Sequence, residues 1–439
     1  MDLLTSAYTN DSDDDGDASS QPPSKRPRFP HGNNHQTPTP TFRPQSFPAY
    51  RRNPMPMPNF RPEPPVPGRY VSKRDRALME SSNQLQEPSR PAPVAPPSVS
   101  VTGSISNSNL LPEVSLALKQ RKNDRTSSGL PERLSLSFTG HSKAVNAIQW
   151  SPSHSHLLAS AGMDNMVYIW NVWSQDQKKA RVVNCHTSAV KDVKWSTQGL
   201  SVLSCGYDCT SRLSDVEKGI ETQVFKEDQV VGVVKFHPKN FNLFISGGSK
   251  GNLKLYDIRA GKAVHEYHRR LGPILDVEFI NDAKQFISSS DVSGSNISEN
   301  SIIVWDVLRQ VPLSNQVYVE AFTCPCIKSH PSDPHFVAQS NGNYIAIFSS
   351  LHPYRLDKYK RYEGHGVGGF PVKCNFSFNG DIIASGSYDG NIYLYNYHSS
   401  LLMKKIKVYE QPCIDVAFHP IMPNVVATCS WSGDVSILH

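Results

Sequence analysis

The fold is decided by the stretch GHSKAVNAIQW (residues 140–150) and its continuation LLASAGMDNMVYIWN (residues 157–171). In both pieces apolar residues alternate with small or polar ones, and the second piece turns on Gly, Asp and Asn, which predicts short strands and no helix. The unit recurs, with near copies VKDVKW and VLSCGYDCTSRLSD (190–195, 202–215) and VVKFHP and LFISGGSKGNLKLYD (233–238, 243–257). Self-similarity of this kind predicts a repeat architecture.

The repeats align on the residue that ends the third strand of each unit. The aligned residues are Trp170, Ser214, Tyr256, Trp305, Phe348, Tyr395 and Leu438, and their successive spacings are 44, 42, 49, 43, 47 and 43 residues. A period of about 40 to 45 residues is that of a four-stranded propeller blade. We therefore predict an all-β, seven-bladed β-propeller over residues 132–439, and we expect RLSLSF (133–138) to supply the last blade's missing fourth strand and close the ring.

The first 131 residues differ from the rest in composition. They hold 22 of the 34 prolines and no apolar run long enough for a core, so we expect residues 1–131 to form a disordered Pro-rich tail. The tail carries 16 Lys and Arg against 12 Asp and Glu, which leaves 29 against 27 for the propeller. This near-neutral balance lacks the basic footprint of a duplex-binding domain, so any contact with RNA is expected to be indirect.

Two charged segments of the tail, together with the cysteines, bear on where in the cell the protein is located. An acidic run spans Asp11–Asp17, and PSKRPRFP (23–30) exposes Lys25, Arg26 and Arg28 as a predicted nuclear import signal. The chain has no run of about 20 apolar residues, so we expect no membrane contact. Its eight scattered cysteines favour a reducing compartment, and we predict the nucleus, with the cytosol as the alternative.

Over residues 132–439 the sequence resembles the WD40-repeat family. The resemblance implies a structural hydrogen-bonded tetrad of His, Ser or Thr, Asp and Trp, which the first unit contains as His141, Ser160, Asp164 and Trp170. Units two and six repeat the first three types as His186, Ser204 and Asp208, and as His365, Ser385 and Asp389. The residue types are also those of a hydrolytic triad, but their recurrence in several blades favours a structural role.

Other patterns that imitate chemistry have a structural explanation. Gly364, Gly366 and Gly369 satisfy GxGxxG, but a strand-like segment follows where a dinucleotide site needs a helix. Cys324 and Cys326 supply two thiolates of the four that a structural zinc requires. We therefore predict no catalytic residue, no metal, no cofactor and no small-molecule substrate.

A narrower resemblance concerns the pre-mRNA-processing factor 17-like subfamily. It rests on LYDIRAGKAVHEYHRRLGPILDVEF (255–279), GHGVGG (364–369) and RYVSKRDRAL (69–78). The resemblance implies a non-catalytic scaffold that assembles proteins in a multi-subunit nuclear complex for pre-mRNA processing. One alternative is a substrate-receptor or adaptor subunit, for example of a ubiquitin ligase. Another is a hydrolase, which needs a non-repeating cluster of acids and bases in the channel that the repeats do not show.

The geometry of the WD40-repeat family also implies where partners dock. Positions just before the turn Asp, and beside the bulge that opens each inner strand, face the top surface around the channel. The predicted partner-binding residues are Met163, Tyr207, Tyr388 and Trp431 before the turn, and Lys191, Leu275, Phe370 and Ile414 beside the bulge. Most fall in units six, seven, one and two, which are consecutive in a closed ring, so we expect one apolar and aromatic patch.

Overall fold

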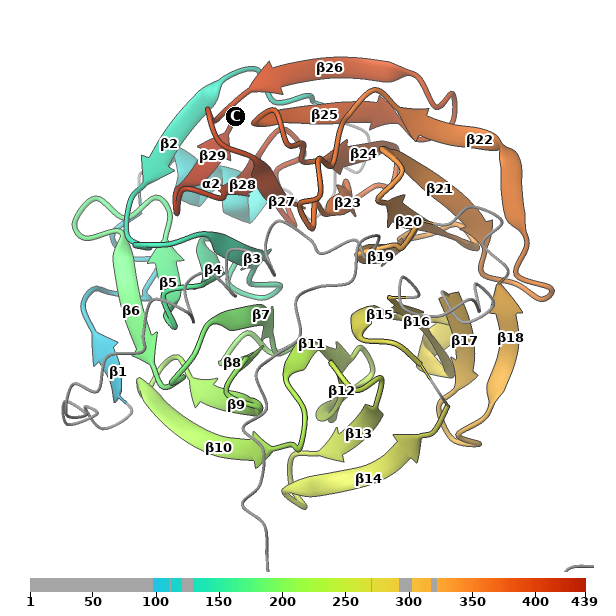
Figure 1. Ribbon diagram of the computed structural model, residues 1–439. Helices are drawn as coiled ribbons and strands as arrows, with labels where there is room; N and C mark the ends of the chain where they lie inside the picture. Colours follow the sequence, from blue (N-terminus) through green and yellow to red (C-terminus); the bar gives the residue numbers. More distant parts are fainter. Residues whose placement is uncertain (1–97, 111, 121–128, 270, 292–301, 317–321) are drawn as a thin grey trace, which may run out of the picture. The chain divides into compact units, whose positions relative to one another are not determined.

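The computed structural model of the 439-residue chain describes residues 98–110, 112–120, 129–269, 271–291, 302–316 and 322–439. Within these residues the strands form seven antiparallel sheets arranged around a central axis (Figure 1). The seven-bladed, all-β propeller predicted from the repeats is therefore confirmed. The acidic run, the import segment and residues 69–78 lie outside the described residues.

Each blade contains the four strands of the repeat, ordered from the axis outward. Each of the seven residues on which the repeats were aligned lies on a third strand. The inner strands are β3 (Val145–Trp150), β7 (Val190–Trp195), β11 (Val231–His237), β15 (Ile274–Ile280), β19 (Cys326–Ser329), β23 (Cys374–Phe376) and β27 (Cys413–Phe418). The second strands are β4 (Leu157–Gly162), β8 (Ser201–Gly206), β12 (Asn240–Gly248), β16 (Gln285–Ser290), β20 (His335–Ser340), β24 (Ile382–Ser385) and β28 (Val426–Ser430). The third strands are β5 (Val167–Asn171), β9 (Thr210–Asp215), β13 (Leu253–Asp257), β17 (Ile302–Asp306), β21 (Tyr344–Ser349), β25 (Asn391–Asn396) and β29 (Val435–Leu438). The outer strands are β6 (Lys179–Asn184), β10 (Ile220–Lys226), β14 (Lys262–Tyr267), β18 (Pro312–Gln316), β22 (Leu356–Glu363), β26 (Leu402–Lys407) and β2 (Leu134–Phe138), and a short 3-10 helix, η1 (Asn281–Ala283), joins β15 to β16.

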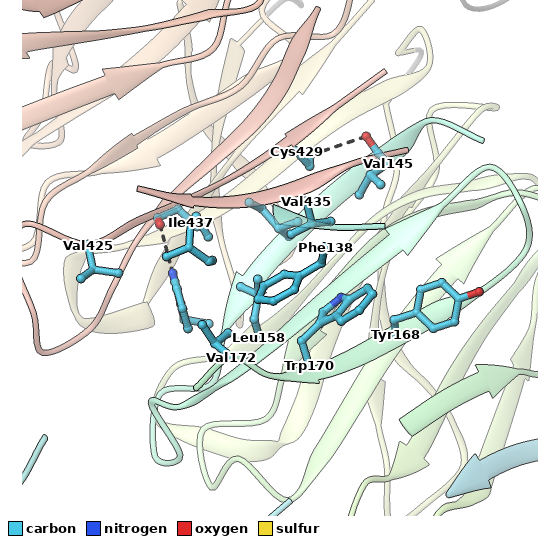
Figure 2. Close-up of a cluster of buried hydrophobic side chains, with 14 of the residues drawn as sticks. Phe138, Val145, Leu158, Tyr168, Trp170, Val172, Val425, Cys429, Val435 and Ile437 are labelled. Atoms are coloured by element: carbon cyan, nitrogen blue, oxygen red, sulfur yellow. Dashed lines mark hydrogen bonds between the residues drawn. The ribbon is translucent and has the colours of Figure 1, made fainter. Parts of the chain in front are cut away.

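The outer strand of the seventh blade comes from the chain that precedes the first blade. β2 pairs antiparallel with β29, with Phe138 opposite Val435. The ring of Phe138 stacks on Trp170 of the first blade, with centroids 5.2 Å apart and an angle of 14° between the planes. Figure 2 shows this pair inside the buried cluster that joins the two blades. β2 thus removes an open sheet edge and connects both ends of the ring.

Aspartates on three inner strands link neighbouring blades. Each follows a β-bulge and accepts a backbone N–H from the next inner strand: Asp192 from Val234 (3.4 Å), Asp276 from Ile327 (2.7 Å) and Asp415 from Ile148 (3.1 Å). Hydrogen bonds to a charged acceptor are stronger than neutral ones. The bond from Ile148 to Asp415 crosses the junction between the last and first blades. The inner strands of these two blades do not follow one another in the chain, so this hydrogen bond helps to hold them together.

Ordered structure begins before the segment that the sequence analysis assigned to the propeller. β1 (Ser98–Val101) pairs with β6 and makes the first blade five-stranded, and α2 (Pro112–Gln120) places Ala117 and Leu118 against the cluster between blades seven and one. Arg181, which is buried, donates from Nη1 to the carbonyl of Gly103 at 2.7 Å. Satisfied polar contacts of this kind fix residues 98–110 on the propeller despite their weak apolar pattern.

Candidate docking surface

The tetrad of the first blade is formed as the family resemblance implied. The ring of His141, which lies before β3, bonds from Nδ1 to Asp164 Oδ1 (2.9 Å) and from Nε2 to Ser160 Oγ (2.8 Å). The indole N–H of Trp170 donates to the same hydroxyl at 2.8 Å. The four side chains tie the loop before β3 to β4, to the β4–β5 turn and to β5, and so fix the top of the blade.

Burial separates this tetrad from a hydrolytic triad. Ser160 is fully buried, and its oxygen is occupied by both His141 and Trp170. Burial acts to raise the pKa of Asp164, but the hydrogen bond and electrostatic attraction of His141, together with the N–H groups of Ser142 and Met166, outweigh that effect and keep the pKa below the ordinary value. A substrate cannot reach the hydroxyl, so the arrangement serves to hold structure.

The later blades use other networks. In blade two His186 bonds to Asp208 (2.9 Å) and Ser204 (2.8 Å). Burial acts to raise the pKa of Asp208, but its contacts with His186, Thr210 and the N–H of Thr187 together lower that pKa to about 2. In blade six the predicted pairing of His365 with Asp389 is wrong. His365 instead bonds to the hydroxyl of Tyr395 (2.8 Å) and to Gln339 of blade five (2.7 Å).

The difference in blade six has a physical reason in the residues that replace the tetrad partners. Tyr395 lacks an indole N–H and places a hydroxyl near the histidine. Asp389 bonds instead to the hydroxyl of Tyr393 (3.0 Å) and to Lys405 (3.1 Å). The two tyrosines of β25 therefore place His365 and Asp389 in two separate hydrogen-bond networks.

Tyr388 is the most exposed aromatic residue among the predicted partner-binding positions, with 53% of its surface accessible. The 364–369 loop wraps one side of its ring, so a Cβ added to Gly366 would lie 2.4 Å from the ring and one added to Gly368 would lie 3.0 Å away. The N–H of Tyr388 donates to the carbonyl of Gly366 at 2.8 Å. Gly366 of the GxGxxG pattern and its neighbour Gly368 thus make room for an aromatic side chain.

Phe370 and Trp431 extend the aromatic surface across the junction of blades six and seven. Their rings meet edge to face with centroids 5.2 Å apart, and both pack, half-buried, on the cluster beneath them. Backbone bonds from Cys413 to Ser387 and from Trp431 to Pro412 hold this region next to the turn that carries Tyr388. We call Phe370, Tyr388 and Trp431 the apical aromatic surface.

Ile414 was predicted to bind partners, and the structure contradicts this because its side chain is fully buried. Ile414 lies at the bulge of β27, between Cys413 and Asp415, and belongs to the apolar cluster beneath Phe370 and Trp431. Its β-branched apolar side chain gains more from this cluster than a solvent-facing position would give. Ile414 supports the surface from below.

The remaining predicted positions are half-buried and more widely spread. Met163 lies on blade one, and on blade two the ammonium of Lys191 lies 5.2 Å from the ring centre of Tyr207. Leu275 lines the central channel on blade four, which does not adjoin the other blades of the patch. The structure therefore brings together the residues of blades six and seven and leaves Leu275 apart.

The sequence analysis missed the charged side chains of the central channel. Lys194, Lys235, Lys328 and Lys373 line it together with the aspartates that link the blades. For Lys194 and Lys235 the signal is their position just before the final aromatic residue of the inner strand, as in VKDVKW. Across the described ranges no group of three or more His, Cys, Asp or Glu has a geometry suited to a metal ion, and no helix is long and apolar enough to cross a membrane.

Seven blades, each built on a four-stranded repeat, and a complete His–Ser–Asp–Trp tetrad define the class of the protein. The family model for the WD domain, G-beta repeat, matches residues 132–171, 177–215 and 357–396, and the chain belongs to the WD40-repeat family. It is similar to WD repeat-containing protein 25 of Mus musculus, with 35% identity over 84% of this chain and 69% of that protein.

The comparisons also confirm the resemblance to pre-mRNA-processing factor 17. The chain is 30% identical to that protein from Mus musculus and from Homo sapiens, over 70% of this chain and 52% of theirs. The protein of that name from Saccharomyces cerevisiae is 26% identical over 67% of its length. The match therefore spans about half of the mammalian relatives of this name.

Proposed function

We propose that this protein is a non-catalytic scaffold that holds partner proteins within a nuclear pre-mRNA-processing complex. The observation that carries the proposal is the 30% identity with pre-mRNA-processing factor 17 over 70% of the chain. A closed ring supports it physically, because the blades stay rigid while their loops present side chains to partners.

The apical aromatic surface is the proposed docking site. Aromatic side chains bury a large area with few rotatable bonds, and Tyr and Trp retain a polar group for a hydrogen bond. Tyr388 is held by the 366–368 backbone before any partner arrives. Preorganisation of this kind reduces the entropy lost on binding.

Affinity purification of the full chain from nuclear extract, followed by mass spectrometry, tests the function. We expect pre-mRNA-processing components to be enriched with the wild-type protein and depleted with Tyr388→Ala. A matched control is Tyr359→Ala, because Tyr359 is a fully exposed tyrosine on the outer strand of blade five. Enrichment of ubiquitin-ligase adaptors in place of processing factors contradicts the proposal and supports a substrate receptor.

Nuclear entry is proposed to depend on Lys25, Arg26 and Arg28 of the tail. An exposed cluster of basic residues suits recognition by an acidic transport receptor. Replacing all three by Ala should shift a fluorescently tagged full chain toward the cytoplasm, whereas replacing Arg51 and Arg52 should not. Unchanged nuclear accumulation of the triple variant excludes this segment as the signal.

A further inference from the structure

The inner strands direct alternate side chains into a central cavity of about 380 Å³. The strand registers define two layers along its axis. Residues opposite Ile245, Ile287 and Val337 of the second strands are Lys235, Glu278 and Lys328, which therefore lie at one height. By the same register Gln149, Lys194 and Asn375 complete what we call the basal layer.

The layer two residues earlier along the inner strands has the opposite charge. It contains Asp192, Asp276 and Asp415 with one cation, Lys373, which pairs with Asp415 at 3.5 Å. These aspartates are engaged by backbone N–H groups of the adjacent blades. The basal layer holds three lysines and one glutamate, so the channel is polarised with its positive end toward the hairpins that join inner and second strands.

The basal lysines differ in how their charges are compensated. Lys194 pairs with Asp192 and Lys235 with Glu278, each at 2.6 Å. The side chain of Lys328 makes neither an ion pair nor a hydrogen bond with any described residue, although it lines the same cavity. Burial acts to lower the pKa of Lys328, but the acidic groups around it, led by Cys326 and Asp276, raise that pKa well above the ordinary value. Lys328 is thus a charged donor in the lining of the cavity.

A neutral donor lies in the same layer. The side-chain oxygen of Gln149 accepts the backbone N–H of Trp195 at 2.6 Å, which fixes the amide, and the NH₂ group of this cavity-lining residue has no hydrogen-bond partner among the described residues. Three ammonium groups and an amide donor from different blades therefore converge on one polar cavity. An anion with several acceptor oxygens matches this set of donors.

We propose that the basal layer of the channel binds a phosphate group. Five lysines line the cavity against three aspartates and one glutamate, which is a formal charge of +1, and the excess of cations lies in the basal layer with its three lysines and one glutamate. A phosphate offers three acceptor oxygens and a carboxylate two, so a phosphate can engage more of these donors. Lysine binds phosphate as a point charge, and three acceptor oxygens can engage Lys328, Gln149 and a second lysine together.

The phosphate can belong to a phosphorylated side chain of a protein or to a small soluble polyphosphate, and two probes distinguish these sources. Isothermal titration of the full chain with tripolyphosphate, at fixed ionic strength and without divalent cations, reports the small anion. Fluorescence anisotropy with a short phosphoserine peptide, compared with its unphosphorylated form, reports the side chain. Saturable one-to-one binding of at least one probe is expected, and the tighter of the two identifies the source.

Lys328→Gln removes this charge without breaking a direct ion pair, but it also removes a cation that the surrounding acidic groups favour, so its melting should stay cooperative at a somewhat lower temperature. Its affinity for the bound probe should fall about tenfold, as expected for the loss of a hydrogen bond to a charged group. Lys284→Gln is the matched control, since it makes the same change of net charge at an exposed site outside the channel. Absence of saturable binding by both probes, or an equal loss in the two variants, overturns the proposal.

Discussion

At the scale of single residues, Tyr388 shows how glycines, which have no side chain, make room for an exposed aromatic ring. Gly366 and Gly368 leave room for its ring, and Gly368 adopts a positive φ of 54° that favours glycine. The three glycines that satisfied GxGxxG in the sequence suggested a phosphate loop, which we rejected for lack of a helix. Of these three glycines, Gly366 has a steric role here, which depends on a side chain 22 residues further along the chain.

Gly366→Ala should therefore disturb docking without altering the docking residue. The new Cβ would lie 2.4 Å from the Tyr388 ring and must displace it, so we expect partner capture to fall as it does for Tyr388→Ala. Gly261→Ala provides the comparison, because that site has φ +64° and no atom within 4 Å. It should cost about 1 kcal/mol of stability through backbone strain and leave capture intact. Equal capture by wild type and Gly366→Ala contradicts this role of the loop.

Buried histidines should make stability depend on pH. Burial lowers the pKa of His365 to about 4 and that of His419 to about 3. In the unfolded chain both have a pKa of about 6.5, so below that pH the unfolded state binds more protons. Stability is therefore complete above about pH 6.5 and should fall on acidification by up to about 1.4 kcal/mol per pH unit for each histidine.

Urea unfolding at pH 7.5, 6.5 and 5.5 measures this dependence. His419→Asn should be less stable at pH 7.5, because His419 donates to the carbonyl of Ser155 at 2.9 Å, but its stability should fall less steeply with pH. His398→Gln alters an exposed histidine and should keep the wild-type slope. The same slope in His419→Asn and wild type would show that His419 is not held neutral.

At the scale of elements, the seventh blade depends on a strand from the far end of the propeller sequence. A chain beginning at Thr139 lacks β2 and with it the stacking of Phe138 on Trp170. Compared with a chain beginning at Gly129, it should lose several kcal/mol, of which burial of one Phe side chain accounts for about 2 to 3, and should melt at a lower temperature. Identical cooperative melting of the two chains would show that β2 does not stabilise the ring.

The elements also show what the sequence could predict. Repeat spacing located all seven third strands, because in six of the blades the register is set by an apolar or aromatic residue, such as Trp305 or Tyr395, that must be buried. β1 was missed because its pairing depends on the edge of β6 and on Arg181, which lie about 80 residues away. Ile414 was wrongly predicted to be exposed because it lies at a β-bulge. At a bulge, strand alternation alone does not decide whether a side chain points to solvent, since packing against the next blade also contributes.

At the scale of the whole molecule, the ring separates two kinds of site. The apical aromatic surface lies on the loops of blades six and seven, whereas the basal layer lies within the channel toward the opposite ends of the inner strands. The first suits an apolar protein partner and the second an anion. Variants at Tyr388 and at Lys328 should therefore have independent effects on capture and on phosphate binding.

Docking of partners on the apical aromatic surface is tested most directly by quantitative capture of the main partner by a Tyr388→Ala, Trp431→Ala double variant. The two truncations together should weaken binding by about 2 kcal/mol or more, the scale of an interface hot spot. The variant should keep a cooperative melt at a somewhat lower temperature, because Trp431 packs on the buried cluster. Tyr359→Ala, on the rim, should capture the partner as the wild type does. Normal capture by the double variant would contradict the account and move the docking site to the rim or to the tail.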